Sequence, residues 1–276
     1  MRVGNSVKSI NPKVSIIMGI YNCEKTLRES IDSIINQGYD NWELIMCDDC
    51  STDSTFCIAQ RYKDMYPDKI KLINNEFNLT LAPTLNKCLK IASGEYIARQ
   101  DGDDISVSNR LEVQVEFLER NLQFDLVASS MTSFDENGVK GVRGWNKQIP
   151  QKQDLIYSVP FCHATIMTRA KVYKDLSGYR VNKYTTRCED VDLWFRFFDK
   201  GFRGYNLQEP LYMVRDDNEA YKRRTFRNYF NLFLVNLNGY KLLKVSKKYY
   251  LYLLKPLLSA ITPNFIIKIY HKTQLT

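Results

Sequence analysis

The sequence has few of the features that mark exported, membrane-spanning or disulfide-stabilised proteins. It contains no run of eighteen uninterrupted apolar residues, so no membrane-spanning helix is expected. Residues 1–13 are polar and contain no apolar core, so no secretory signal peptide is expected. The seven cysteines are odd in number and show no paired spacing, which favours a reducing compartment over a disulfide framework. Together these absences predict a cytoplasmic protein.

Histidine is scarce as well, since the chain has only two. Cys47-Asp48-Asp49-Cys50 has the C-x-x-C spacing of zinc ligands, but no second cysteine pair and no histidine lies near it in the sequence. A structural zinc site is therefore not expected.

Acidic residues are absent from residues 220–276, although this segment contains eleven lysines and arginines. The net charge of the whole chain is only +8, so the remainder is slightly acidic. Basic residues alternate with apolar and aromatic runs, as in Lys247–Lys255 and Phe265–Tyr270. This pattern predicts a basic helical extension that associates with an anionic membrane, at the inner face of the cell membrane.

Two other interpretations of the extension stay open. A basic and aromatic segment also suits nucleic-acid binding, but the leucine and isoleucine runs favour a membrane, and no nucleic-acid partner is expected. The other alternative is a helical cap packed on the rest of the chain, or a partner interface, with the lysines facing water.

The first half of the chain alternates between strand-like and helical periods. Strands are predicted at residues 14–18, 42–47, 70–73 and 96–98, and helices at residues 27–35, 58–66, 81–92 and 111–122. Such alternation is typical of an α/β fold, with a mostly parallel sheet and helices on both faces. Ligands bind such sheets beyond the carboxyl ends of the strands.

Beyond Leu126 the pattern changes to strand-like pieces at residues 126–131, 139–145 and 164–167, with helices at 169–175 and from about 189. These pieces predict a smaller mixed sheet packed beside the first. We therefore expect one domain over residues 1–219, with halves at 13–104 and 105–219, followed by the extension at 220–276.

Acidic and small polar residues follow the predicted strands. Asp101-Gly102-Asp103-Asp104 follows the fourth strand and Asp48-Asp49 the second, so the carboxylates converge on one edge of the sheet. Like charges held together repel, and a hard divalent cation that bridges them to a diphosphate relieves the repulsion. The edge is therefore predicted to bind a metal with a nucleotide or phosphate group. A solvated acidic turn is the alternative, which this convergence disfavours.

Four motifs in this order resemble the family 2 glycosyltransferases, which have the nucleotide-diphospho-sugar transferase (GT-A) fold. They lie at residues 14–22, 43–53, 92–104 and 189–194, and the resemblance covers the first 215 residues. Gly19 stands where the family often has proline, and Cys50 where it often has glycine. Neither change removes a charged or hydrogen-bonding group, so the resemblance implies that the activity is retained.

The resemblance implies that the half at 13–104 is a Rossmann-like sheet that binds a UDP-sugar donor. It implies that the half at 105–219 binds the acceptor. It implies that the Asp49 carboxylate accepts a hydrogen bond from the uracil ring. Tyr21 is expected to pack on the base or ribose, with a strand-end core residue as the alternative. Arg99 is expected to orient Asp101 or Asp103, with a surface ion pair as the alternative. The whole donor-binding set is Gly19, Tyr21, Asn22, Asp49, Arg99 and Asp101.

By the same resemblance, Asp103 is the principal ligand of Mg²⁺ or Mn²⁺, and Asp101 lies between the ribose and the metal. Glu189 and Asp190 resemble the catalytic acidic pair of the family, with Asp190 as the general base and Glu189 supporting it. Such a base takes the proton from the attacking hydroxyl during transfer with inversion. Stabilisation of a helix start is the alternative role for both acids, and the two roles are compatible.

Three further residues are candidates for the acceptor or metal site. His163 follows a proline–phenylalanine pair and is a candidate for either, with a structural histidine as the alternative. Trp194 is a candidate on the acceptor side, and Arg215 is a candidate for contact with the diphosphate.

The Gln-x-x-Arg-Trp motif of processive synthases is absent from the sequence. The resemblance therefore implies transfer of one sugar from a UDP-sugar to a hydroxyl of a glycan or lipid-linked acceptor. The family members that it resembles most build bacterial surface polysaccharides such as O-antigen or capsule. A metal-dependent nucleotidyltransferase, which releases pyrophosphate, and a non-catalytic nucleotide-sugar-binding module are the alternatives.

Overall fold

The computed structural model describes residues 11–144, 147–216 and 225–262, and the predicted strands and helices of the first half are present with small shifts at their ends. The strands are β1 (Val14–Ile20), β2 (Trp42–Asp48), β3 (Ile70–Asn74), β4 (Tyr96–Arg99), β5 (Ile105–Ser106), β6 (Leu126–Asp135), β7 (Gly138–Arg143), β8 (Met167–Arg169) and β9 (Gly204–Arg215). The α-helices are α1 (Leu27–Ile35), α2 (Thr55–Met65), α3 (Leu81–Ile91), α4 (Arg110–Arg120), α5 (Ala170–Asp175), α6 (Glu189–Asp199), α8 (Phe226–Leu242) and α9 (Leu254–Ile261). Three 3-10 helices are η1 (Lys152–Ile156), η2 (His163–Thr165) and η3 (Lys247–Leu253).

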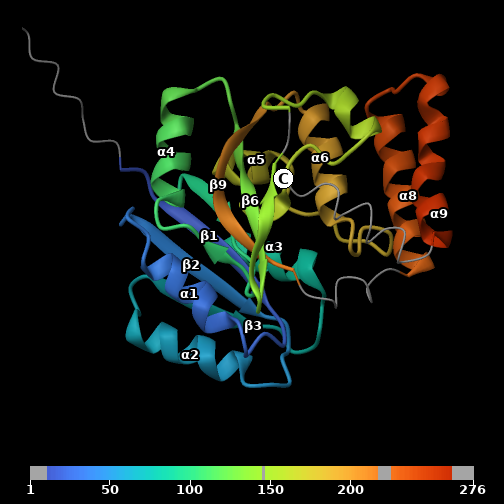
Figure 1. Ribbon diagram of the computed structural model, residues 1–276. Coiled ribbons are helices and arrows are strands. Elements are labelled where there is room, and N and C mark those ends of the chain that lie inside the picture. The colour runs from blue at the N-terminus through green and yellow to red at the C-terminus, as the bar shows by residue number, and fades with distance from the viewer. Residues whose placement is uncertain (1–10, 145–146, 217–224, 263–276) are drawn as a thin grey trace, which may run out of the picture.

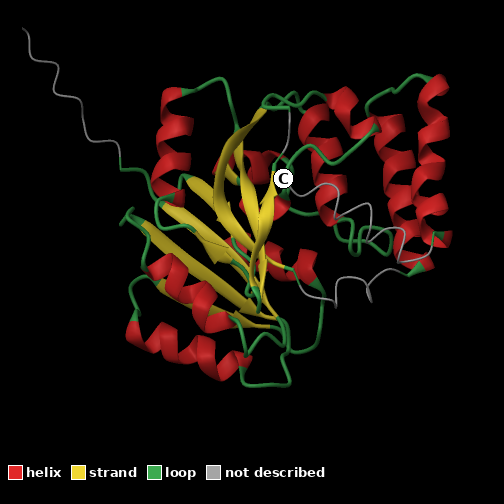
Figure 2. Ribbon diagram, viewed as in Figure 1, coloured by secondary structure: helices red, strands yellow, loops and turns green. Residues whose placement is uncertain are grey.

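The strands form one nine-stranded sheet with the order β3-β2-β1-β4-β8-β6-β9-β5, and β7 pairs with β6 at the side. β3, β2, β1 and β4 are parallel, which confirms the prediction for the first half. Helices cover both faces of the sheet (Figures 1 and 2). The carboxyl ends of the four parallel strands meet at one edge, where the sequence predicts a ligand site.

The strands of the second half join the same sheet instead of forming a smaller sheet beside it. β8 is antiparallel to β4 on one side and to β6 on the other, so it connects the two halves. β6 and β9 run parallel to each other, and β5 is antiparallel to β9. The predicted strand at 164–167 instead starts within the 3-10 turn η2, which ends at Thr165; Ile166 is extended, and strand β8 begins at Met167. The mixed strand directions of the second half were predicted. The joining of these strands to the first sheet was not predicted, because it depends on hydrogen bonds between residues far apart in the sequence.

Side chains of the central strands alternate between two hydrophobic cores. In β2, Trp42, Leu44 and Met46 face one core, and Ile45 and Cys47 face the other. α1, α2 and α4 pack over the first core, whereas α3, α5 and α6 pack over the second. Because both faces are buried, the strand sequences are almost continuously apolar.

The described part of the extension packs on the body of the protein. α8 lies beside α6, and α9 lies on the far side of α8, on the side of the molecule away from α1 and α2 (Figure 1). Val235, Tyr240 and Leu253 are buried in the second core, and the Tyr240 ring lies 6.2 Å from the ring of Phe195 on α6. The helical-cap interpretation therefore applies to residues 225–262. The basic and apolar stretches at 222–224 and 265–270 lie outside the described residues.

No helix in the described ranges is long and apolar enough to cross a membrane.

Gly239 permits the close approach of α8 to α6. A Cβ atom at this position would lie 2.3 Å from two ring carbons of Phe195, a side chain that is almost fully buried. Such a contact cannot form without moving the helix or the ring, so a glycine is required here for packing.

Gly239→Ala is expected to lower the free energy of unfolding by about 1–3 kcal/mol, because the added methyl group overpacks the α6–α8 contact. Helix propensity acts in the opposite direction and favours alanine by about 1 kcal/mol. The sign of the change, measured by urea denaturation, therefore reports on the packing. Asn238→Ala, at an exposed position of the same helix, is the control. A stabilising effect of Gly239→Ala would show that α8 does not pack on α6 in this way.

Candidate active site

A cleft of about 620 Å³ lies at the carboxyl ends of β1, β2 and β4. Its walls include seven of the predicted site residues, which are Gly19, Tyr21, Asp49, Arg99, Asp101, Asp103 and Glu189. The convergence that the sequence predicted at this edge of the sheet is therefore present. The other candidates, Asn22, His163, Asp190, Trp194 and Arg215, lie outside the lining of the cleft.

Asp49 is held in the wall of the cleft as a hydrogen-bond acceptor. Its Oδ1 atom accepts a hydrogen bond of 2.7 Å from Asn75 Nδ2 and another of 2.7 Å from the backbone N–H of Leu79. The side chain is buried, so these two donors fix its orientation. Asn75 in turn donates to the hydroxyl of Thr84 on α3, which ties this wall to the helix.

The end of β1 supplies the next part of the cleft. Tyr21 lines it with 49% of its surface exposed, so it is not the core residue that was the alternative. A Cβ at Gly19 would lie 3.1 Å from Leu81, so this glycine lets α3 approach the strand. Asn22 instead holds two loops together, because its Oδ1 atom accepts a hydrogen bond of 2.9 Å from the backbone of Thr52.

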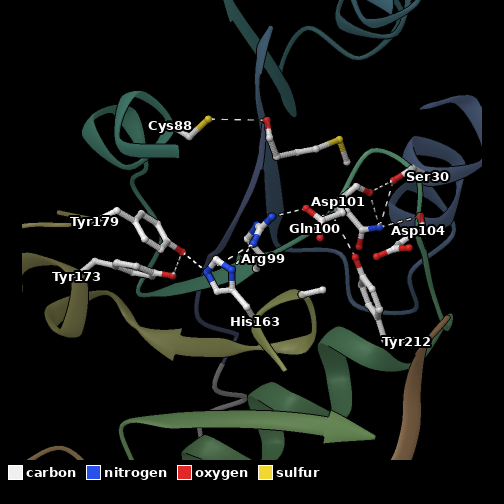
Figure 3. Close-up of polar contacts among 12 residues, drawn as sticks. Ser30, Cys88, Arg99, Gln100, Asp101, Asp104, His163, Tyr173, Tyr179 and Tyr212 are labelled. Atoms are coloured by element: carbon white, nitrogen blue, oxygen red, sulfur yellow. Dashed lines mark hydrogen bonds and ion pairs between the residues drawn. The ribbon is translucent and has the colours of Figure 1, made fainter. Parts of the chain in front are cut away.

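Arg99 lines the cleft and connects Asp101 to a row of rings formed by His163, Tyr179 and Tyr173. One arm of its guanidinium forms an ion pair with Asp101, and Nη1 lies 2.7 Å from Nδ1 of His163. His163 Nε2 lies 2.7 Å from the hydroxyl of Tyr179, which is 2.7 Å from that of Tyr173 (Figure 3). Arg99 is buried and pairs with Asp101, so it does not form the surface ion pair that was the alternative.

The hydrogen bonds of His163 define its tautomer. Burial and the positive charge of Arg99 hold the pKa of His163 well below its usual value, so the imidazole is neutral. Because a guanidinium can only donate, Nδ1 accepts from Arg99 and the proton lies on Nε2, which donates to Tyr179. Both ring nitrogens are engaged, which leaves neither for a metal ion in this arrangement. The structural alternative for His163 describes its position better than a place in the cleft.

Arg110 organises the loop that follows β4 although it is fully buried. Its guanidinium donates to the side chain of Gln100 at 3.1 Å and to the backbone carbonyls of Arg99 at 2.8 Å and Ile166 at 3.3 Å. Gln100 Nε2 donates to the backbone carbonyl of Asp104 at 2.9 Å (Figure 3). The backbone that carries the acidic residues is therefore held from below by fixed donors.

Asp104 and Arg215 also hold this loop, and neither lines the cleft. Asp104 Oδ1 accepts a hydrogen bond of 2.9 Å from the backbone N–H of Arg215. Arg215 Nε donates to the backbone carbonyl of Asp103 at 3.1 Å, and its guanidinium forms an ion pair with Glu29. Burial, followed by the charges of Asp101 and Asp103, raises the pKa of Asp104 to about 8. Both residues therefore support the loop instead of lining the cleft.

Asp101 and Asp103 are the two carboxylates of the loop that line the cleft, and they offer hard oxygen ligands. Within residues 11–144, 147–216 and 225–262, no group of three or more His, Cys, Asp or Glu side chains is arranged to hold a metal ion. Mg²⁺ in proteins is commonly held by one or two carboxylates plus the phosphates of a substrate. The residues present therefore fit a divalent cation that binds together with a diphosphate.

The start of α6 forms a further part of the wall. Glu189 lines the cleft, and burial followed by the charge of Asp190 raises its pKa. Burial also raises the pKa of Asp190, partly opposed by backbone hydrogen bonds from the first turn of the helix. Trp194, one turn later, is fully buried, with its ring 5.3 Å from that of Phe161. It belongs to the core beneath the site.

Four residues of the site were not predicted, and they are Gln100, Arg110, Tyr179 and Arg187. Arg110 and Gln114 are four residues apart beside the apolar positions of α4, and a polar pair on a buried helix face was the available signal. Arg187 lines the cleft from the segment before α6, with a left-handed φ of 65°. No sequence pattern marks it, because its place depends on the fold of that segment.

The sequence model of Glycosyl transferase family 2 matches residues 15–177 of the chain. The chain is 51% identical over 264 residues to EpsE of Bacillus subtilis (strain 168), covering 96% of this chain and 95% of EpsE. It is 34% identical over 203 residues to the UDP-Glc:alpha-D-GlcNAc-diphosphoundecaprenol beta-1,3-glucosyltransferase WfaP of Escherichia coli, covering 73% of this chain and 77% of WfaP.

Two solved structures share the fold. S. aureus TarS in complex with UDP-GlcNAc superposes with a TM-score of 0.67 at 19% identity, covering 91% of this chain and 82% of TarS. The mannosyltransferase PcManGT from Pyrobaculum calidifontis, in complex with GDP-Man and Mn²⁺, superposes with a TM-score of 0.64 at 17% identity, covering 91% of this chain and 76% of PcManGT. The family match and the two relatives show that the chain belongs to glycosyltransferase family 2 and is a glycosyltransferase with the GT-A fold.

Proposed function

We propose that the enzyme transfers one sugar from a UDP-sugar, with inversion, to a hydroxyl of a glycan or lipid-linked acceptor in bacterial surface polysaccharide synthesis. The observation that carries the proposal is the single cleft in which Asp49, Asp101, Asp103 and Glu189 meet from separate elements. The donor named in WfaP and the UDP-GlcNAc bound to TarS support a UDP-sugar. The lipid-linked acceptor in the name of WfaP supports the same class of acceptor.

The donor nucleotide is assigned to the side of the cleft formed by β1 and β2. The Asp49 carboxylate, anchored by Asn75 and Leu79, accepts the ring N–H of uracil, which a carboxylate can do without moving. Tyr21 is exposed in the cleft and covers the base or the ribose. Arg187, in the segment before α6, also lines the cleft and supplies a positive charge for the diphosphate.

The diphosphate is assigned to the loop that follows β4. Asp103 and Asp101 would hold Mg²⁺ or Mn²⁺, which neutralises the charge that develops as the nucleoside diphosphate leaves. Arg99 keeps Asp101 oriented through their ion pair. His163, a neutral acceptor, fixes the other arm of Arg99 and so acts as a positioning residue.

Asp190 is proposed to take the proton of the acceptor hydroxyl as its oxygen attacks the anomeric carbon and the bond to the diphosphate breaks. It neighbours Glu189, which lines the cleft, and its pKa is raised by burial, so it is a stronger base than an exposed aspartate. Glu189 lies in the same first turn of α6, where its carboxylate interacts favourably with the helix dipole and supports Asp190.

The outer face of η3 and α9 is proposed to contact an anionic membrane at the inner face of the cell membrane. Leu251, Leu254 and Leu258 expose 76%, 47% and 59% of their surfaces, although they are large and apolar. Lys247 and Lys248 precede them in the chain. An exposed apolar row with neighbouring lysines suits an interface with anionic lipids.

Asp103→Asn is expected to weaken UDP binding in the presence of Mg²⁺ by at least about tenfold, because an amide is a poorer ligand for a hard cation. Isothermal titration calorimetry measures the affinity for UDP with Mg²⁺ and with EDTA. In EDTA, the unaltered enzyme and Asp103→Asn are expected to bind UDP equally weakly. Asp68→Asn, at an exposed position, is the control. Unchanged affinity of Asp103→Asn in Mg²⁺ would remove Asp103 from the metal site.

Asp190→Asn is expected to lower kcat/KM by about 10²–10⁴, since the base is lost, while UDP affinity is retained. The assay measures UDP released from a panel of UDP-sugars with a mixture of lipid-linked acceptors. Asp199→Asn, exposed at the far end of α6, is the matched control. Glu189→Gln is expected to have the smaller effect, and a larger effect would assign the base to Glu189.

The pH profile gives a second readout of Asp190 in the same assay. The base acts only when deprotonated, so kcat/KM is expected to fall as pH falls through the raised pKa of Asp190. This limb should lie above the usual aspartate range near about 3.9 and should be absent from Asp190→Asn. Release of pyrophosphate in place of UDP would show that the enzyme is a nucleotidyltransferase instead.

Leu251→Asp is expected to weaken binding to vesicles of equal parts phosphatidylglycerol and phosphatidylcholine by at least about tenfold, because burial of a leucine is lost and a negative charge is added. Vesicle co-sedimentation at low salt measures the binding. Leu122→Asp is the matched control, since Leu122 is 75% exposed in the loop after α4, away from the extension. Equal effects of the two changes, or no binding by the unaltered protein, would refute the membrane contact.

A further inference from the structure

A second hollow, here called the α3–α5 groove, lies between these two helices and has a volume of about 790 Å³. Volumes of roughly 300–1,000 Å³ are typical of small-molecule sites. Most of its surface is apolar, and its lining residues include Leu79, Pro83, Leu89, Ala92, Ile97 and Tyr173. No acidic side chain of the described residues lines it. The groove is therefore able to bury an apolar chain of substantial length.

Four lysines border the α3–α5 groove, two from α3 and two from α5. They are Lys87, Lys90, Lys171 and Lys174. Lys171 forms an ion pair of 2.8 Å with Asp125, so its charge is balanced. The other three form no ion pair with any part of the chain that the structure describes. Three uncompensated positive charges beside an apolar floor favour a ligand that is both anionic and apolar.

The wall of the α3–α5 groove is built firmly. Asn86 on α3 accepts a hydrogen bond of 2.8 Å from the backbone N–H of Tyr179 and donates one of 2.8 Å to its carbonyl. Gly178 has a φ of 70°, and a Cβ there would lie 2.4 Å from Asn86 Oδ1. The segment after α5 is thereby fixed against α3, so the groove does not depend on a ligand to hold its shape.

The α3–α5 groove and the donor cleft share two structural borders. Leu79 lines the groove, while its neighbours Asn78 and Thr80 line the cleft. The segment between α5 and α6 contributes Val181 to the groove and Arg187 to the cleft. A ligand that occupies the groove therefore lies next to the site where the sugar is transferred.

A hydrogen-bonded path also connects the two sites. Tyr173 forms part of the groove floor, and its hydroxyl contacts that of Tyr179, which contacts His163. His163 in turn accepts from Arg99, the partner of Asp101 (Figure 3). The residues that shape the groove therefore also position the predicted metal ligand.

We propose that the α3–α5 groove binds the lipid carrier of the acceptor, with its hydrocarbon chain on the apolar floor and its diphosphate at Lys87, Lys90 and Lys174. The inference rests on the proposed function, because it places the lipid portion of a lipid-linked acceptor next to the cleft. More than one phosphate charge is needed to match three lysines, which favours a lipid diphosphate over a lipid with one phosphate.

Farnesyl diphosphate, a short isoprenoid diphosphate, is the probe. Its affinity for the full chain is measured by isothermal titration calorimetry with saturating UDP and Mg²⁺, so that the donor cleft is filled. Lys90→Glu/Lys174→Glu, which changes two exposed lysines of the groove, is expected to weaken binding at least tenfold. Lys152→Glu/Lys200→Glu makes the same charge change at exposed positions outside the groove and is expected to leave the affinity within twofold.

Farnesol and inorganic diphosphate test the two halves of the ligand separately. Each is expected to bind at least tenfold more weakly than farnesyl diphosphate, because each makes only one of the two kinds of contact. Equal affinity for inorganic diphosphate would overturn the lipid assignment. Tighter binding of dihexanoyl phosphatidylglycerol would assign the groove to a bilayer phospholipid and overturn it as well. The groove is refuted as the site if the two double variants lose equal affinity for farnesyl diphosphate. It is refuted as well if the unaltered enzyme does not bind farnesyl diphosphate, or if farnesyl diphosphate competes with UDP.

Failure of the proposed function is seen separately in these titrations. If the unaltered enzyme does not bind UDP, the donor assignment is wrong. The farnesyl diphosphate titration is then performed without UDP, and the comparison of the two variant pairs still decides whether the groove binds a lipid diphosphate.

Discussion

The buried guanidinium of Arg110 is the constraint on which the site depends. It has no carboxylate within ion-pair distance in the described part of the chain, and burial lowers its pKa to about 10, which leaves it charged near neutrality. Its stability there rests on hydrogen bonds to Gln100 and to backbone carbonyls of Arg99 and Ile166, and on the ring of Tyr212, 4.7 Å from the guanidinium carbon. A buried charge that lost these partners would be costly, so the loop, β4 and the turn before β8 are held in one arrangement.

The three acidic side chains of the loop, Asp101, Asp103 and Asp104, differ in their burial and in their partners. Asp101 is paired with Arg99, and Asp103 lines the cleft. Asp104 is buried behind them, where desolvation and its two acidic neighbours raise its pKa. The neutral ring of His163 completes the environment of Arg99 without adding a second positive charge. The loop therefore presents two carboxylates to the cleft and keeps the third as structural support.

Much of the fold was predictable because its signals are local. The apolar runs of β1, β2 and β4 and the helical periods between them predict a parallel sheet with covered faces, which the structure confirms. The acidic residues after β2 and β4 meet in one cleft for the same topological reason. The continuity of the sheet through β8 was not predictable, because it rests on pairings with β4 and β6, which lie about 70 and 40 residues earlier in the chain.

The sequence by itself determined the family, the edge of the sheet that forms the site, and the basic character of the extension, since these depend on residue type and order. Tertiary structure decided the positions that depend on distant partners. Trp194 and His163 lie beneath the cleft because the aromatic core of α6 buries one and Arg99 and Tyr179 engage the other. The extension packs on α6 because Gly239 allows the close approach of α8 to Phe195. Leu251 stays exposed. Hydrogen bonds and close packing between distant segments have no signature in any local pattern.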